Sequence, residues 1–207
     1  FIIFGMAEKD ENNKFYNIAV IIGKNGEFIG KYRKTHLDEI DIKWAKSGEK
    51  IVVIPTEIGR IGIMIGSEIL FPEIAGVLAV KRSDIIVIPS SWADKGAKVW
   101  LKEIQANPEI PVNKYPDNNI CLLDSIALTA QAYTIFANFI GSKNKYIGKS
   151  AVYTLDPLYG LDWPIVASSN KDETLMIDFT TIQPNWWFNQ EKMISSRKPY
   201  LYKALIY

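Results

Sequence analysis

Apolar runs separated by turn residues divide the first third of the chain into short strands. The sequence Gly-Lys-Asn-Gly at 23–26 is typical of a tight turn between antiparallel strands, and Glu-Ile-Gly-Arg at 57–60 indicates another turn. Residues 5–14 are polar and predict a turn after a first short strand. The predicted strands cover Phe1–Phe4, Tyr16–Ile22, Glu27–Tyr32, Ile51–Ile54 and Ile61–Ile65, with a charged, irregular segment at Lys34–Glu49.

Helical and strand patterns alternate further along the chain. Phe71–Val80 has helical spacing with small residues, and Asp84–Pro89 is an almost purely apolar run, typical of a strand covered on both faces. Leu122–Ala132 predicts a second helix and Tyr133–Phe139 a further strand. This order of strand, helix and strand predicts two βαβ units in a mixed sheet that helices cover on one or both faces.

The remaining segments are less regular. Three prolines within residues 100–116 predict a long loop or an insertion. We expect late strands at Ala151–Thr154 and Thr174–Asp178, separated by a loop rich in Pro, Gly and Asp, and then an aromatic and basic tail at Gln183–Tyr207. Neither a repeat nor a linker interrupts the pattern, so residues 1–207 are predicted to form a single domain.

Composition and charge narrow the class of function. With 207 residues, of which 48% are hydrophobic and 23% charged, the chain is typical of a globular protein and unlike a disordered one. Its net charge of +1 gives no general attraction for nucleic acid or for an anionic membrane. One cysteine, Cys121, and one histidine, His36, supply neither an internal disulfide nor a Cys/His zinc site. We therefore expect no structural metal and a reducing, cytoplasmic compartment.

The two segments that could be mistaken for membrane or targeting signals have other interpretations. The uncharged stretch from Ser125 to Ser142 contains Gln131 and Asn138, so it predicts a buried helix that leads into a buried strand. Phe1–Gly5 lacks the basic residues and cleavage site of a signal peptide. Because the chain opens inside a core strand, we expect that a preceding segment of the protein has been cut away.

Several ordered motifs along the chain resemble those of one known family. The motifs are Phe15-Tyr16-Asn17, the run from Gly26 to Leu37 with Tyr32-Arg33-Lys34-Thr35-His36, Ile61-Gly62-Ile63-Met64-Ile65 leading to Phe71-Pro72-Glu73, Ala137-Asn138-Phe139-Ile140-Gly141, Gly148-Lys149-Ser150, and Arg197-Lys198-Pro199-Tyr200-Leu201-Tyr202. Together they resemble the signatures of the nitrilase superfamily of carbon-nitrogen hydrolases. The resemblance implies an α/β fold of the α+β type, a four-layer αββα sandwich, here without its first strand-helix unit.

The resemblance also implies a reaction, the hydrolysis of amides, carbamoyl compounds or nitriles by a Glu, Lys and Cys triad. A thiol attacks well only when a base takes its proton, and a lysine ammonium can stabilise the oxyanion that develops. Lys34 matches the lysine of this pattern and is the predicted oxyanion stabiliser. The other interpretation of Lys34 is a solvated cation at the end of a strand.

The nucleophile position departs from the family pattern. The match of Ile65-Gly66-Ser67-Glu68 places Gly66 where the family has its cysteine, and glycine has no side chain to attack with. Cys121 lies ahead of a predicted helix and is better explained as a small buried residue. Ser67 could be a relocated nucleophile, although a shift of one residue turns the side chain to another face.

Other acidic residues have a structural and a functional interpretation. The family's general base belongs to a strand-helix unit preceding Phe1, so the intact protein is expected to supply it. Glu8 resembles a structural acidic residue of the family, and Glu39 or Asp41 could be the second acidic residue near the lysine. Glu68 is predicted either to stabilise the start of a helix or to make the pocket polar.

Further residues are candidates for the pocket wall. Ser90, Ser91 and Trp92 follow a strand covered on both faces, where ligands of α/β sheets commonly bind. His36 shares the face of Lys34 if the strand continues, but a lone histidine is more often a hydrogen-bonded structural residue. Trp186 and Trp187 are expected at an interface or in the core.

Three readings remain open from the sequence. The protein is a carbon-nitrogen hydrolase variant that uses Ser67 or an activated water, a non-catalytic pseudoenzyme that binds small molecules or acts as a scaffold, or a hydrolase carrying an engineered Cys-to-Gly change. The expected ligand is a small amide or nitrile, and the resemblance implies a homodimer or a larger assembly through Phe71–Val80 and the tail. No organic cofactor is predicted, because no phosphate-binding glycine loop occurs.

Overall fold

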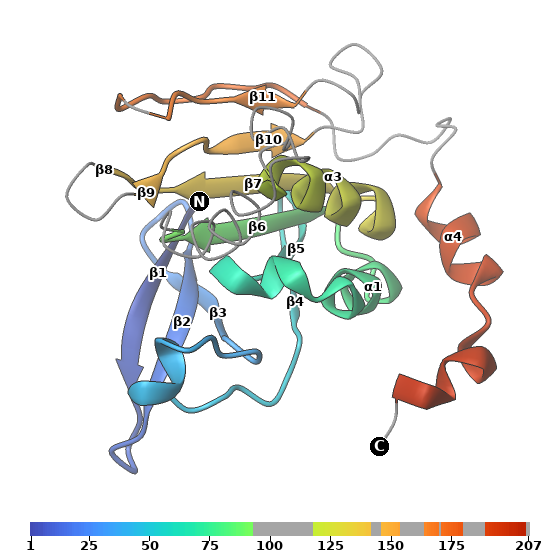
Figure 1. Ribbon diagram of the computed structural model, residues 1–207, viewed down its shortest axis with the longest axis horizontal. Helices are drawn as coiled ribbons and strands as arrows, with labels where there is room; N and C mark the ends of the chain where they lie inside the picture. Colours follow the sequence, from blue (N-terminus) through green and yellow to red (C-terminus); the bar gives the residue numbers. More distant parts are fainter. Residues whose placement is uncertain (93–117, 142–145, 154–163, 170, 180–188, 206–207) are drawn as a thin grey trace, which may run out of the picture.

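The structure is a computed structural model (Figure 1), which describes residues 1–92, 118–141, 146–153, 164–169, 171–179 and 189–205. The predicted insertion within 100–116 and the pair Trp186-Trp187 lie outside the described residues. Cys121 falls in a described helix, but its side chain does not belong to the described part, so its predicted burial stays a prediction.

An antiparallel sheet of three strands opens the fold. Strands β1 (Ile2–Lys9), β2 (Phe15–Ile22) and β3 (Phe28–Arg33) lie in the order β1-β2-β3. The predicted turn at 23–26 joins β2 to β3, and Gly26 takes a φ of 83°, which suits glycine. The prediction of a turn from residue 5 was wrong, because β1 continues until Lys9 pairs with Phe15. The turn itself spans 10–14, where Asp10 accepts backbone hydrogen bonds from Asn12 and Lys14.

A mixed sheet of six strands forms the centre of the molecule, in the order β11-β10-β7-β6-β5-β4. Strands β5, β6 and β7 run parallel, and helices α1 and α3 connect them, which confirms the two predicted βαβ units. Figure 1 shows α1 and α3 side by side along this sheet. The bounds are β4 Val53–Thr56, β5 Gly59–Ile63, α1 Pro72–Val80, β6 Ile85–Ser90, α3 Asn118–Ala130, β7 Tyr133–Asn138, β10 Ala151–Tyr153 and β11 Ile165–Val166.

Two hydrophobic cores define the layers of the fold. The first packs α1 and α3 on the six-stranded sheet, and its buried residues include Ile74, Leu78, Ile86, Ile88, Leu123 and Phe136. The second joins the two sheets and includes Ala19, Ile21, Tyr32, Ile61, Ile63 and Val87. The described residues therefore provide the helix, sheet and sheet layers of an αββα sandwich, and the predicted fold class is confirmed.

The carboxyl-terminal part differs most from the sequence-based expectation. Thr174–Asp178 belongs to no strand, whereas β11 lies in the segment predicted as a loop. A short pair, β8 (Ile140–Gly141) with β9 (Tyr146–Ile147), follows β7. Helix α4 (Gln190–Ser196) and a 3-10 helix at Pro199–Leu205 form the tail. Among the described helices, none has the length and apolar character to span a bilayer.

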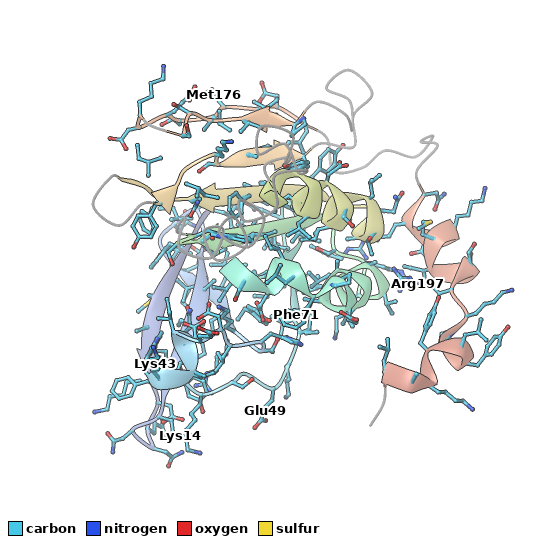
Figure 2. The ribbon with its side chains drawn as sticks, viewed as in Figure 1. Lys14, Lys43, Glu49, Phe71, Met176 and Arg197 are labelled. Carbon is cyan, nitrogen blue, oxygen red and sulfur yellow. The ribbon has the colours of Figure 1, made fainter. Side chains whose placement is uncertain are left out.

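The tail is attached to the helical side of the fold. Gln190 donates hydrogen bonds to the carbonyl oxygens of Ser83 and Ala130, which follow or end α1 and α3. Arg197 lies between α4 and the two helices (Figure 2), with its guanidinium 3.4 Å from the carbonyl oxygen of Thr129. These contacts fix α4 against α1 and α3.

Candidate functional site

The register of the parallel strands brings three positions to one edge of the central sheet. Ile63 of β5 pairs with Val87 of β6, and the backbone N–H of Met64 still bonds to the carbonyl oxygen of Val87. Gly66 and Ser90 each lie three residues after such a pair, and Ser90 in turn pairs with Asn138 of β7. Ligands of α/β proteins bind outside the carboxyl ends of parallel strands, which is where these positions lie.

Gly66 forms a sharp turn at the end of β5. Its φ of 49° lies in the left-handed region, and a 3-10 helix spans Gly66–Leu70. A Cβ atom at this position would meet one described side-chain atom within 4 Å, the Ser90 hydroxyl oxygen at 3.8 Å. The turn therefore has space for a side chain, although the backbone conformation is one that favours glycine.

Lys34 is buried beside the end of β3 and is held by two carboxylates. Its exposed fraction is 2%, and its ammonium bonds to Asp38 Oδ2 at 2.9 Å and to Asp41 Oδ2. Asn17 of β2 donates to the other Asp41 oxygen at 3.0 Å. Of the two acidic residues predicted near Lys34, Asp41 is the one in contact, since Glu39 is exposed. A buried ammonium paired in this way is not the solvated cation of the alternative interpretation.

Asp38 connects this cluster to the turn at Gly66. Its Oδ2 atom also accepts a hydrogen bond of 3.1 Å from the Ser67 hydroxyl. Although burial opposes the shift, the Asp41 N–H and the Lys34 ammonium lower the pKa of Asp38 to about 2. The sequence motifs did not indicate Asp38. Its spacing of four residues from Lys34 is a signal that could have found it, because the chain turns at Asp38–Asp41.

Glu68 joins the loop after β3 to the turn at Gly66. It has no exposed surface, and its carboxylate accepts hydrogen bonds from five donors. The donors are the Tyr32 hydroxyl, the Thr35 N–H and hydroxyl, the His36 N–H and the Ile65 N–H, at 2.7 to 3.1 Å. Burial, together with the charge of Glu68, raises the pKa of Tyr32, so the phenol keeps its proton and donates it. Glu68 thus bonds to the residue preceding the 3-10 helix and also fixes the residues next to Lys34.

Asn138 holds the chain that follows Ser90 at the end of β6. Its side-chain oxygen accepts from the Trp92 N–H at 2.8 Å, and its amide group donates to the carbonyl oxygens of Trp92 and Gly148. Trp92 is partly buried against the core under the helices, while Ser91 is exposed. Of the three predicted wall residues, Ser90 is therefore the one whose polar group lies at Gly66.

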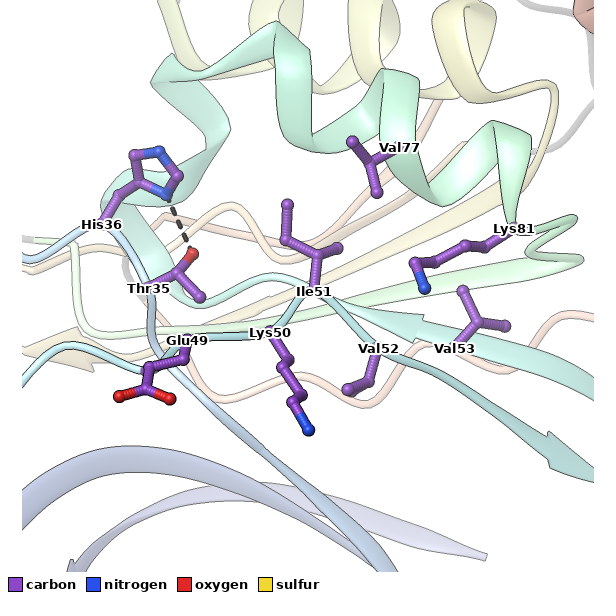
Figure 3. Close-up of a pocket in the computed structure, with 10 residues that line it drawn as sticks. Thr35, His36, Glu49, Lys50, Ile51, Val52, Val53, Val77 and Lys81 are labelled. Carbon is purple, nitrogen blue, oxygen red and sulfur yellow. Dashed lines mark hydrogen bonds between the residues drawn. The ribbon is translucent and has the colours of Figure 1, made fainter. Parts of the chain in front are cut away.

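A separate groove lies beside Thr35 and His36, the two residues that follow Lys34 (Figure 3). Its volume is about 600 Å³, and it is lined by Thr35, His36, Gly48, Glu49, Lys50, Ile51, Val52, Val53, Val77 and Lys81. His36 bonds through Nδ1 to the Thr35 hydroxyl and packs on Phe71 with ring centres 4.3 Å apart, as a structural histidine would. Gly66, Ser67 and Ser90 are not part of the groove, so it is distinct from the site at the end of β5.

Glu8 lies away from this site. It bonds to Arg33 at 2.7 Å and to Lys31 at 2.6 Å across the three-stranded sheet. The Arg33 guanidinium is the main cause that holds the pKa of Glu8 at about 2. Its contacts are those of a structural ion pair.

Residues 1–157 match the carbon-nitrogen hydrolase family. The chain belongs to the carbon-nitrogen hydrolase family. It is 32% identical over 155 residues to a nitrilase of Pyrococcus abyssi, covering 73% of this chain and 50% of that protein. It is 33% identical over 110 residues to the deaminated glutathione amidase of Dictyostelium discoideum, covering 47% and 37% of the two chains. The carbon-nitrogen hydrolase chain thus spans half or less of the length of these two relatives.

Solved structures show the same fold. An amidase from Nesterenkonia sp. superposes with a TM-score of 0.72 and 16% identity, covering 99% of this chain and 66% of that one. A variant of that amidase is described with the acetamide moiety of fluoroacetamide added covalently at the active site cysteine, and another in complex with butyramide. This likeness shows the fold of the carbon-nitrogen hydrolases.

No group of three or more metal-ligating side chains occurs among the described residues of this chain.

Proposed function

We propose that residues 1–207 form a single carbon-nitrogen hydrolase-like domain whose cysteine-dependent hydrolysis of amides, nitriles or carbamoyl compounds is impaired or lost. The observation that carries this proposal is Gly66, which occupies the left-handed turn at the end of β5 where the family motif has its nucleophile. Without a thiol at this position no thioester-type intermediate can form there.

The surroundings of Gly66 support a binding site that has kept its polar framework. Lys34 remains buried with an ordered ammonium, and Glu68 holds the adjacent loop through five hydrogen bonds. A buried cation near the end of parallel strands suits the carbonyl oxygen of a small amide. We therefore propose a small, non-peptide amide or nitrile-like molecule as the ligand.

A relocated nucleophile at Ser67 finds less support. A hydroxyl needs a general base to take its proton, and the hydrogen-bond acceptor of Ser67 is Asp38. Because the pKa of Asp38 is about 2, this carboxylate is a poor proton acceptor at neutral pH. The same argument weighs against Asp38 as the base for an attacking water. A non-catalytic, ligand-binding pseudoenzyme is therefore the second candidate, and it agrees with the same framework.

The deciding experiment measures ammonia released from a panel of amides and nitriles by the full-length protein. The variants are Gly66→Cys, Lys34→Ala and the double variant, with Gly66→Ser as a matched test of hydroxyl attack. We expect little or no turnover by the wild type, and ammonia release from Gly66→Cys that the added Lys34→Ala change abolishes.

The outcomes separate the candidates. Turnover only in Gly66→Cys supports loss of an ancestral activity and rejects the water mechanism. If neither the wild type nor Gly66→Cys releases ammonia, the result supports a pseudoenzyme. Robust wild-type turnover that Lys34→Ala abolishes would overturn the proposal and would make this chain an enzyme with an unorthodox nucleophile.

We also propose that the protein forms a homodimer or a larger assembly. A cytoplasmic location is proposed only because the chain has a single cysteine. The tail supports the assembly, because Tyr200, Leu201 and Leu205 expose 63%, 64% and 65% of their surface within the short segment Pro199–Leu205, which kinks at Tyr202. Sedimentation of the full-length protein should show an assembly that Leu201→Glu weakens and that Lys203→Glu, in the same segment, does not. A monomeric wild type would refute this proposal.

A further inference from the structure

Ser90 carries a buried hydroxyl that the fold does not use. Its oxygen has no hydrogen-bond partner among the described residues. Buried hydroxyls are nearly always paired, because leaving one unpaired costs stability. Other buried polar groups around the site are satisfied, Lys34 by two carboxylates and Glu68 by five donors, so the unpaired hydroxyl is the exception.

Strand register explains where this hydroxyl lies. Along β6 the side chains of Ile86 and Ile88 enter the core under the helices, and Ser90 continues the same alternation. Parallel pairing with β5 places Ser90 beside Gly66, which leads to the 3.8 Å separation from an ideal Cβ at position 66. The hydroxyl therefore borders the space that any side chain at position 66 would enter.

The position of Ser90 is fixed from both sides. Asn138 pairs with Ser90 in the sheet and holds the backbone of Trp92 two residues further on. Gly5 of β1 lies near Pro89, the residue before Ser90, where β1 and β6 are in contact. A polar group on a backbone that sheet pairing holds in this way is well suited to orient a ligand.

We propose that Ser90 is the hydrogen-bonding anchor for a small primary amide that binds over Gly66. The inference rests on the proposed function, which supplies the class of ligand, and it adds the residue that binds the ligand's polar end. A serine hydroxyl can donate to a carbonyl oxygen or accept from an amide N–H, so it suits either end of the group. The ligand would supply the partner that the described residues do not.

This role predicts two effects of opposite sign for Ser90→Ala. Removing the hydroxyl should weaken binding of butyramide about 10-fold, as expected for one lost hydrogen bond with its partner left unpaired. In the absence of ligand the same change removes an unpaired buried group, so Tm should stay unchanged or rise by about 1–4 °C. A serine that stabilises the fold would instead lower Tm when it is replaced.

The experiment titrates butyramide into the full-length protein by calorimetry or ligand-observed NMR and measures Tm without ligand. Ser91→Ala is the matched control, because Ser91 is the exposed neighbour of Ser90. We expect Ser91→Ala to bind like the wild type. The inference is overturned if the wild type does not bind butyramide, if Ser90→Ala binds as tightly as the wild type, if both alanine variants lose affinity equally, or if Ser90→Ala lowers Tm by several degrees.

These readouts are independent of turnover. Ammonia release by the wild type would refute the proposed loss of activity, yet the ratio of the two dissociation constants would still test Ser90. Conversely, an absence of butyramide binding overturns the role of Ser90 and leaves the proposal about Gly66 to the ammonia assay.

Discussion

The two sides of the candidate site differ in how completely their polar groups are paired. Where the loop after β3 meets the turn, Lys34 and Glu68 are buried, and hydrogen bonds satisfy both of them. On the β5–β6 side, Gly66 has no side chain and the Ser90 hydroxyl has no partner in the described structure. The hydrogen bonds of Lys34 and Glu68 therefore hold the loop and the turn together without a side chain at position 66.

Replacement of Glu68 should have the largest effect on the paired side. Glu68→Ala leaves several buried donors without an acceptor, so we expect a loss of about 4 kcal/mol in the free energy of unfolding. Glu68→Gln should cost about 2 kcal/mol, because its amide group would face the Ile65 N–H while its oxygen keeps the other donors. Urea denaturation measures both values, and Glu39→Ala, at an exposed position, should stay within about 0.5 kcal/mol of the wild type.

Removal of the Lys34 charge should have the next largest effect. Lys34→Met keeps most of the stem volume but leaves Asp38 and Asp41 without their cation, so we expect a loss of about 3 kcal/mol. Combining it with Asp41→Asn should restore part of that loss, giving a coupling energy above about 1 kcal/mol in a double-mutant cycle. Additive effects would contradict a tightly paired cluster, and Lys43→Ala is the exposed-lysine control.

The unpaired side should respond weakly. Gly66→Ala puts a Cβ into open space but at a φ of 49°, so we expect it to cost about 1 kcal/mol through backbone strain alone. Gly5→Ala is the control, because its Cβ would make ordinary contacts at 3.8 and 3.9 Å and its φ lies outside the left-handed region. Equal costs for the two variants in thermal unfolding would show that the turn at Gly66 is not strained.

The ion pairs of Glu8 with Lys31 and Arg33 should have the smallest effect on stability, and that effect should depend on pH. The pKa of Glu8 is lowered from 4.5 to about 2 in the folded protein, so its ion pairs stabilise the fold above about pH 4.5 and lose that contribution as the pH falls towards 2. Glu8→Gln should therefore cost about 0.5 kcal/mol at pH 7 and less at pH 3. A cost that grows on acidification would have the wrong sign for this pair.

Local patterns were sufficient to predict much of the fold. The turn at 23–26, the βαβ order and the apolar strand β6 all depend on neighbouring residues, and the structure contains each of them. The end of β1 was missed because cross-strand pairing, which is not local, keeps polar residues such as Glu8 and Lys9 in the sheet. Thr174–Asp178 shows the reverse case, a strand-like run without a pairing partner among the described strands.

The sequence predicted most of the residues that belong to the candidate site but not the contacts between them. The motif located Lys34 and Gly66, but the choice of Asp41 over Glu39 depends on how the chain turns after β3. The contacts of Glu68 come mainly from residues 32 to 36 positions away, which no spacing rule reveals. Among the described residues the Ser90 hydroxyl has no partner, and its place beside Gly66 follows from the register between two parallel strands, which the sequence does not give.

The left-handed turn at Gly66 affects which residues selection for folding favours at this position. Any residue with a side chain would strain this backbone, whereas glycine adopts it without strain. Selection for folding alone therefore favours glycine here, and only a requirement for turnover would keep a larger residue in place. Once that requirement is relaxed, nothing in the stability of the protein opposes the exchange, and drift would tend to run in one direction.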